Sequence, residues 1–367
     1  MADNYFSNAV NYHLAPIRHL IEDARVTEIL VNGPRSIYVE VQGKLVLVKD
    51  VSFPGEDELH AACVNLAQFA GKQFDREHPR FDGRLPDGSR VHVIGPPTAK
   101  FIAIAIRKFS QTSLTPNDLI RMGSLTTEST LFLRAALLMK RNLLVSGGTG
   151  SGKTTILAIL STFIPEHERI VILEDTSELQ IRLPHVVQLE ARAPDMHGEG
   201  EVTLRDLLHS TLRLRPDRII VGEVRGGEAL DLLNALNSGH GGTMCTLHAN
   251  SAYGALTKLE TLVLFSGEEM PIRAIRAQVA SAVDIVMQVS RFPDGSRRID
   301  HIAEVDSGLD ENGNYQVRGI FRFKGEGLSK EGRVLGGLIP TGTLPAWFDE
   351  AVSKGVRMER GWFGLDG

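Results

Sequence analysis

Residues 147–154 have the sequence GGTGSGKT, which contains the pattern G-x-x-x-x-G-K-[ST] of a phosphate-binding loop. The apolar run NLLVS (142–146) before it indicates a strand, and TTILAILSTFI (154–164) after it indicates a helix. A strand, a glycine-rich loop and a helix in this order form the structural context in which this pattern binds nucleotide phosphates. The sequence therefore predicts a nucleotide-binding loop at the end of a buried strand.

The residue types in this loop each have a chemical reason. Glycines allow backbone N–H groups to curl around phosphate oxygens, and the helix N-terminus adds positive potential. Lys153 is expected to reach the β and γ phosphates, and the Thr154 hydroxyl to bind Mg²⁺. The predicted ligands are thus ATP and Mg²⁺. The predicted nucleotide-binding residues are Gly147, Gly148, Thr149, Gly150, Ser151, Gly152, Lys153, Thr154 and Thr155.

Two further strand-like runs end in carboxylates. Residues 170–173 (IVIL) lead into 174–178 (EDTSE), and residues 218–221 (RIIV) lead into Gly222 and Glu223. Ligands of parallel sheets bind at the carboxyl ends of the strands, so these acidic groups are predicted to face the phosphates. The second run resembles a Walker B strand in which Gly222 replaces the usual Asp, so the metal-side carboxylate would be Glu223. A solvated loop is the alternative for either cluster alone.

Two histidines flank a third strand-like run at 242–247. His240 and His248 are eight residues apart, and this stretch offers too few ligands for a metal site. An imidazole at a strand end can hydrogen-bond the terminal phosphate or a nearby glutamate, which favours a γ-phosphate sensor. One core histidine and one exposed histidine is the alternative.

Local patterns divide the chain into two domains. Residues 1–108 combine alternating strand-like runs with a helical segment at 57–71, which predicts an N-terminal mixed α/β domain. The polar segment 109–123, with Pro116, is the predicted linker. Residues 124–367 are the predicted ATPase domain with a C-terminal tail, since strands and helices alternate there as in a parallel sheet covered on both faces. Beyond about residue 300 we expect a turn-rich strand region, a glycine-rich loop and a last helix near Trp347.

Composition narrows the function. The 367 residues are 42% hydrophobic and 23% charged, as in a globular protein, and the net charge of -5 disfavours direct nucleic-acid binding. Cys63 and Cys245 have no metal-ligand spacing, which indicates a reducing compartment. No secretory pattern or membrane-spanning run is present, so we expect a cytoplasmic protein that reaches a membrane peripherally, by docking on embedded partners.

Four segments in order resemble the boxes of the secretion traffic ATPases. GGTGSGKTT, EDTSEL, RIIVGEVRGGEA and GHGGTMCTLHAN are similar to the Walker A, Asp, Walker B and His boxes of that superfamily. The N-terminal sequences VTEILVNGP and RLPDGSRV resemble its conjugative-transfer and tight-adherence pilus branches. This resemblance implies an α/β fold in which a RecA-like P-loop ATPase core follows a smaller mixed α/β N-terminal domain.

The resemblance also implies roles for residues. Glu178 would activate the attacking water, Glu223 would help hold Mg²⁺ and that water, and His240 and His248 would sense the γ-phosphate. The family implies a homo-hexameric ring in which arginines of the N-terminal domain neutralise charge on the transferred phosphoryl group. The candidate arginines are Arg84, Arg90 and Arg107, with Arg213, Arg215 and Arg225 of the core as competitors.

The sequence therefore predicts an ATP-hydrolysing hexameric motor at the cytoplasmic face of the inner membrane, where components of a bacterial type IV secretion, conjugation or pilus machine would be its partners. A DNA-translocating RecA-like ATPase shares the core, but it should interleave basic with aromatic residues, and aromatics are only 6% of this chain. The acidic and histidine boxes disfavour a scaffold without turnover, and the lack of an acceptor pocket with a base disfavours a small-molecule kinase. Conjugation and tight-adherence pilus systems both remain open.

Overall fold

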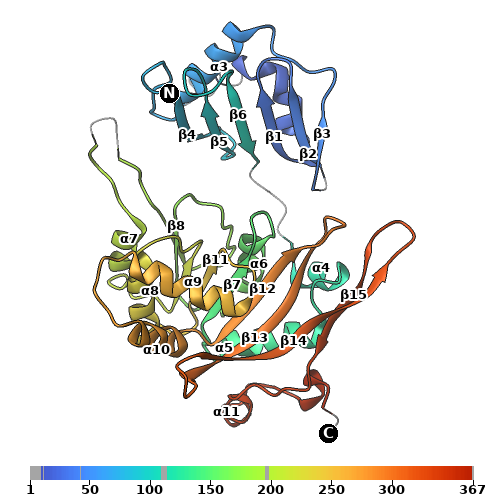
Figure 1. Ribbon diagram of the computed structural model, residues 1–367, viewed down its shortest axis with the longest axis vertical. Coiled ribbons are helices and arrows are strands. Elements are labelled where there is room, and N and C mark those ends of the chain that lie inside the picture. The colour runs from blue at the N-terminus through green and yellow to red at the C-terminus, as the bar shows by residue number, and fades with distance from the viewer. Residues whose placement is uncertain (1–9, 11, 42, 109–113, 195–197, 366–367) are drawn as a thin grey trace. The chain divides into compact units, whose positions relative to one another are not determined.

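The computed structural model describes residues 10, 12–41, 43–108, 114–194 and 198–365. The chain forms two compact units, Met1–Thr112 and Ser113–Gly367 (Figure 1). Each unit has its own hydrophobic core. Among the described helices, none is both long enough and apolar enough to cross a membrane.

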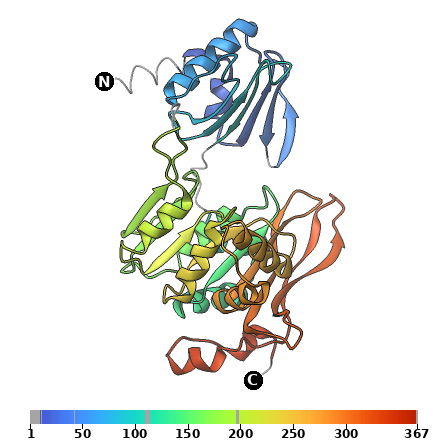
Figure 2. The same ribbon diagram turned by 60° about the vertical axis from the view of Figure 1, so that its left-hand side comes forward.

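The N-terminal unit is an antiparallel sheet with helices packed on it (Figure 2). Its strand order is β3-β2-β1-β6-β5-β4. The strands are β1 (Val26–Asn32), β2 (Ile37–Val41), β3 (Lys44–Leu47), β4 (Arg80–Arg84), β5 (Arg90–Ile94) and β6 (Ala103–Arg107). The helices are η1 (Ala15–Ile17), α2 (Arg18–Glu22) and α3 (Glu56–Phe69).

Alternation in the sequence explains this sheet. Buried Phe81, Val91 and Ile104 alternate with less buried residues along β4, β5 and β6, and they share a core with Leu59 and Leu66 of α3. The strands and turns predicted between residues 26 and 48 are confirmed as the meander β1-β2-β3, and the turn predicted at 86–89 joins β4 to β5.

The second unit is built on a nine-stranded sheet in the order β15-β14-β13-β12-β7-β11-β10-β8-β9. The strands from β12 to β9 pair in parallel, and β12 to β15 pair antiparallel. The parallel strands are β7 (Leu143–Gly147), β8 (Ile170–Glu174), β9 (Val186–Glu190), β10 (Arg218–Val221), β11 (Met244–Leu247) and β12 (Ile285–Arg291). The antiparallel extension is β13 (Arg297–Leu309), β14 (Tyr315–Leu328) and β15 (Val334–Pro340).

Helices cover both faces of this sheet, as the sequence predicted. Val145 of β7 lies in a core with α5 and α6, whereas its neighbour Leu144 lies in a separate core with α7, α8, α9 and α10. Strands buried on both faces are apolar along their whole length, which explains the run at 142–146. The helices are α4 (Pro116–Arg121), α5 (Thr127–Leu138), α6 (Lys153–Ser161), α7 (Leu204–Thr211), α8 (Glu228–Asn237), α9 (Ala252–Leu264), α10 (Ile272–Ala282), α11 (Phe348–Ser353) and η2 (Arg360–Phe363).

The structure differs from two of the predictions made from the sequence. Residues 114–123 of the predicted linker contain α4, which Thr115 and Asp118 begin with a capping box and whose Leu119 is buried in the core of the second unit. The rest of the predicted linker, residues 109–113, lies outside the described residues. The predicted glycine-rich loop near the C-terminus is wrong, because β15 pairs there along β14.

The C-terminal tail belongs to the core of the second unit. Trp347 stacks on Phe132 of α5 with ring centroids 5.6 Å apart, and Phe363 meets the same ring edge-on at 5.9 Å. Arg141 lies over the Trp347 ring and forms an ion pair with Glu350 at 2.5 Å. The tail thus closes one face of the sheet.

One cysteine lies in each unit, and both are predicted to resist alkylation in the folded protein. Cys63 in α3 and Cys245 in β11 are buried, and burial raises the pKa of each thiol to about 12. Because the thiolate is the nucleophile, N-ethylmaleimide at neutral pH should label neither residue until its unit unfolds. Mass spectrometry along a denaturant series should then report Cys63 for the N-terminal unit and Cys245 for the second. Rapid labelling of either residue without denaturant would contradict this burial.

Candidate active site

The glycine-rich loop connects β7 to α6 as the sequence predicted. Gly150 and Gly152 have φ angles of +68° and +97°, in the left-handed region that favours glycine. Lys153 begins α6, so the first N–H groups of this nine-residue helix point toward the loop. The local chain therefore has the form of a phosphate-binding cradle.

Parallel pairing brings His248 to this cradle. The strand β11 lies beside β7, with Leu247 paired to Ser146, so His248 follows β11 at the level where the loop begins. The Nζ of Lys153 donates to the carbonyl oxygens of Gly147 and Gly148, both at 3.1 Å, and lies 3.2 Å from Nε2 of His248. The lysine thus lies between the loop and the end of the neighbouring strand.

Glu223 completes this group from the next strand, β10. Its side chain is 17% exposed, with Oε1 2.6 Å from Nε2 of His248 and Oε2 2.5 Å from Nη2 of Arg225. Burial lowers the pKa of His248, although the charge of Glu223 opposes this change. One nitrogen cannot donate to Glu223 and accept from Lys153 at once, and the shorter contact favours donation to the carboxylate.

Arg225 lies among three carboxylates. Its Nη2 forms an ion pair with Oε2 of Glu223, and its Nη1 is 3.4 Å from Oδ2 of Asp175. The hydrogen bond that Arg225 donates to Glu223, together with the charges of Glu223, Asp175 and Glu178, raises the pKa of Arg225. Arg225 therefore links the loop after β10 to the acidic loop after β8.

Glu174 is a site residue that the sequence analysis did not single out. The whole residue is 3% exposed. Its Oε1 accepts from the backbone N–H groups of Glu178 and Leu179 at 2.9 Å, and its Oε2 accepts from Nε2 of Gln188 at 2.9 Å. Burial raises the pKa of Glu174, and these hydrogen bonds oppose that change. Because buried carboxylates need partners, a Glu at the end of the apolar strand IVILE was the signal for this role.

The position of Glu174 explains the departure at Gly222. A Cβ atom at Gly222 would lie 2.8 Å from Cγ of Glu174, closer than two carbon atoms can approach. The Glu174 side chain thus occupies the space that an Asp at the end of β10 would need. The carboxylates available at this strand end are therefore Glu223 and, from the adjoining loop, Asp175 and Glu178.

The structure does not bring His240 to this site. His240 precedes β11, its Nδ1 lies 3.3 Å from the carbonyl oxygen of Ala235, and its own carbonyl accepts from Thr243. It lies at the amino end of β11 while His248 lies at the carboxyl end, about 13 Å away for four residues of strand. Within one chain, the structure therefore does not bring His240 and His248 together. Arg213 and Arg215 precede β10 and lie at the same distant edge.

The candidate arginines of the N-terminal unit form one row. Arg84 is directly opposite Arg90 in the sheet, and Arg90 is directly opposite Arg107. Directly opposite residues point to the same face, so three cations gather across β4, β5 and β6. Arg107 also faces Glu28 across β1, with Nε 3.9 Å from Oε1. The structure thus groups the three residues that sequence analysis named separately.

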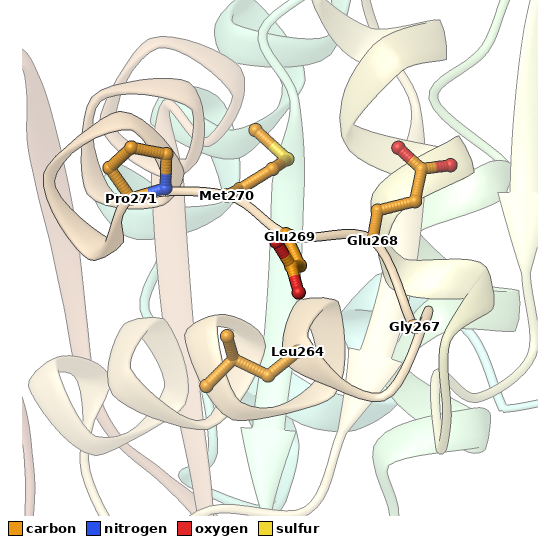
Figure 3. A pocket seen from close by; sticks show the side chains of 6 residues that line it. All are labelled: Leu264, Gly267, Glu268, Glu269, Met270 and Pro271. Carbon is orange, nitrogen blue, oxygen red and sulfur yellow. The ribbon is translucent and has the colours of Figure 1, made fainter.

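Two pockets adjoin α9. One of about 300 Å³ is lined by Glu223, Val224, Arg225, Leu247, His248 and Lys258 and extends the site just described. The other, of about 580 Å³, lies where α9 connects to α10 and contains none of the predicted site residues (Figure 3). Its lining is Leu264, Gly267, Glu268, Glu269, Met270 and Pro271.

Residues 11–318 match the model of the family described as type II/IV secretion system protein. The chain belongs to that family. It is 35% identical over 302 residues to the conjugal transfer protein TrbB of Rhizobium radiobacter, covering 81% of this chain and 88% of TrbB. It is 33% identical over 329 residues to the type IV secretion system protein VirB11 of Brucella suis, covering 81% of this chain and 90% of VirB11.

As a member of this family, the chain is an ATPase. The solved structure of the ATPase DotB of Yersinia pseudotuberculosis shares its fold with a TM-score of 0.57 at 17% identity, over 81% of this chain and 79% of DotB. The predicted RecA-like core with an N-terminal domain is confirmed.

Replacing Gly222 by Ala is predicted to displace the Glu174 carboxylate. The added Cβ meets Cγ of Glu174, and an overpacked core of this kind costs about 1–3 kcal/mol of unfolding free energy. Denaturant unfolding should show this loss. Gly308→Ala is the matched control, because a Cβ there meets nothing within 4 Å. Equal stability of both variants would contradict the packing of Glu174 against Gly222.

Proposed function

We propose that this ATPase is the hexameric motor of a bacterial type IV secretion or conjugation machine. The observation that carries the proposal is the convergence of Lys153, His248, Glu223 and the Glu178 loop at the ends of β7, β11, β10 and β8. TrbB and VirB11 are named for conjugal transfer and type IV secretion, which supports this class of machine. Its partners would then be inner-membrane components, which it meets from the cytoplasmic side.

In this proposal the loop amides and Lys153 hold the phosphates of ATP. Lys153 exchanges the carbonyl oxygens of Gly147 and Gly148 for phosphate oxygens when nucleotide binds. Gly147, Gly148, Thr149, Gly150, Ser151, Gly152, Thr154 and Thr155 complete the cradle. The negative charge of a triphosphate is attracted both to Lys153 and to the N-terminus of α6, where this lysine lies.

The donor set fits Mg²⁺ that arrives with the nucleotide. No group of three or more His, Cys, Asp or Glu in the described part of the chain could hold a metal ion by itself. Mg²⁺ is usually held by one or two protein ligands together with phosphates and waters, and the Thr154 hydroxyl and Glu223 carboxylate supply this set. Bound Mg²⁺ would supply positive charge that neutralises the phosphates.

Glu178 and Glu223 have separate roles in the proposed hydrolysis. Glu178 is proposed to orient and deprotonate the attacking water, and its backbone is fixed by Glu174. Glu223 is held from two sides by His248 and Arg225, which fixes its carboxylate for the metal and the water. His248 then senses the γ-phosphate through its contacts with Lys153 and Glu223. Arg225 serves as a positioning residue for Glu223 rather than as an arginine finger.

The arginine row of the N-terminal unit supplies the remaining positive charge. The row Arg84, Arg90 and Arg107 gathers three guanidinium groups on one face of the sheet, and such a cluster suits an anion. We assign that anion to the transferred phosphoryl group, reached in an assembled homo-hexamer. The row would stabilise the charge that develops during hydrolysis.

Lys153→Ala and Glu178→Gln should separate binding from hydrolysis. Lys153→Ala removes a phosphate contact and should abolish both, whereas Glu178→Gln keeps the shape of the site and should bind ATP normally. A missing general base typically costs about 10²–10⁴ in rate, so Glu178→Gln should lower kcat by that range. Calorimetric ATP binding and steady-state phosphate release test this. A Glu178→Gln enzyme with normal turnover would refute the role of Glu178.

Alanine at Arg84, Arg90 or Arg107 should lower kcat with little change in ATP affinity. An arginine finger acts on the transition state and contributes about 10³–10⁵ in rate, shared here among three residues. Arg80→Ala is the matched control, since Arg80 lies on the same strand at its opposite end. If Arg80→Ala impairs turnover as much as the row variants, the row has no special role.

A further inference from the structure

A hairpin formed by β12 and β13 lies beside the phosphate-binding loop. Val289 of β12 pairs with Gly147, the last residue of β7, so β12 continues past the start of the loop before the chain turns back. Figure 1 shows β12 between β7 and β13. The hairpin turn is thus at the same edge of the sheet as Lys153.

The turn of this hairpin is firmly held. The backbone N–H of Phe292 donates to the carbonyl of Ser296 at 2.8 Å, and that of Gly295 donates to the carbonyl of Phe292 at 2.9 Å. Asp294 accepts from the backbone and the hydroxyl of Ser296, and the hydroxyl bond lowers its pKa to about 2. A residue directly after this turn therefore has a defined place.

Arg297 is that residue, and its side chain lies against the loop. Its Cδ is 3.5 Å from the place where a Cβ would stand on Gly152. Its carbonyl oxygen accepts from the hydroxyl of Ser124 at 2.9 Å, so the backbone is anchored while the side chain is exposed. Within the described residues, no ion pair involves its guanidinium.

Its neighbour Arg298 shows the contrasting, structural use of an arginine. The Arg298 guanidinium lies over the rings of Phe292 and Phe323, at 5.9 and 5.5 Å, and donates to the carbonyl oxygens of Val334 and Gly336 at 2.7 and 3.2 Å. Packing of the hairpin on β14 and β15 thus uses Arg298. Packing gives no corresponding reason for Arg297.

The charges around Arg297 favour an anion. Arg297 stands directly opposite Arg291 in the ladder of β12 and β13. Lys153 adds a third positive group to this edge. Asp294, the acidic residue of the hairpin turn, accepts hydrogen bonds from the Ser296 hydroxyl and from the backbone N–H of Val334. It also interacts with the charge of Arg298. A polyphosphate in the loop would therefore meet the positive charges of Lys153 and Arg297.

We infer that Arg297 is a nucleotide-binding residue whose guanidinium donates to the phosphate chain. This inference rests on the proposed use of the loop for ATP. Guanidinium groups match phosphate oxygens in pairs and remain charged, which suits this position better than a lysine. Since Arg297 belongs to the same unit as the loop, it contacts ATP and ADP alike. It therefore strengthens ground-state binding, and its loss should raise KM and Kd more than it lowers kcat.

The test is the affinity of Arg297→Ala for ADP and for adenosine, measured by isothermal titration calorimetry on the full chain. A lost charged hydrogen bond should raise the Kd for ADP roughly tenfold and leave the weak affinity for adenosine unchanged. Arg297→Lys should lie between wild type and Arg297→Ala. Arg322→Ala is the matched control, because it removes an exposed arginine from β14 of the same sheet and should bind ADP within about twofold of wild type.

Other outcomes separate this inference from the proposed function. If Lys153→Ala loses ADP and Arg297→Ala binds it like wild type, the loop binds nucleotide and the inference about Arg297 is wrong. If Arg297→Ala loses adenosine and ADP equally, the contact is to the base or sugar, which overturns the assignment to phosphate. If the wild-type chain binds no ADP, the proposed function fails and the inference with it. Equal melting temperatures would exclude unfolding of the variant.

Discussion

Parallel hydrogen bonding in the order β12-β7-β11-β10-β8 aligns the carboxyl ends of five strands at one edge of a single sheet. The loop after β7, His248 after β11, Glu223 after β10 and the Glu178 loop after β8 meet there because their strands are neighbours. Residues about 100 positions apart, such as Lys153 and His248, come within 3.2 Å through this pairing. Both cores support the arrangement, since each strand is buried on two faces.

A second constraint acts between two of these strands. The buried carboxylate of Glu174 fixes the backbone of Glu178 and fills the space beside Gly222. The Asp that is usual in a Walker B strand would collide with this side chain. The position of Glu174 therefore depends on the glycine at position 222. Asp175 and Glu223 follow these strands, where Arg225 contacts both carboxylates and His248 contacts Glu223. This edge of the sheet thus combines a buried strand end with charged groups that hydrogen bonds position.

The sequence predicted the features that depend on local chemistry. The loop at 147–154, the carboxylates after apolar strands and the alternation of strands with helices follow from residue type and spacing. Features that depend on strand register were missed: the arginine row needs the pairing of β4, β5 and β6, and Arg297 needs Val289 opposite Gly147. His240 and His248 lie apart because β11 separates them, which puts them at opposite edges of the sheet. The length of the strand-like run at 242–247 already implied that its two ends lie far apart.

Dependence of turnover on assembly tests the account most directly. Steady-state ATP hydrolysis per subunit would be measured across a concentration series, while light scattering gives the mass with and without a non-hydrolysable ATP analogue. The account predicts that turnover per subunit rises as the chain assembles into a hexamer, because the ATPase unit binds nucleotide and the arginine row completes the site in the ring. A monomer that hydrolyses ATP at the full rate would contradict it.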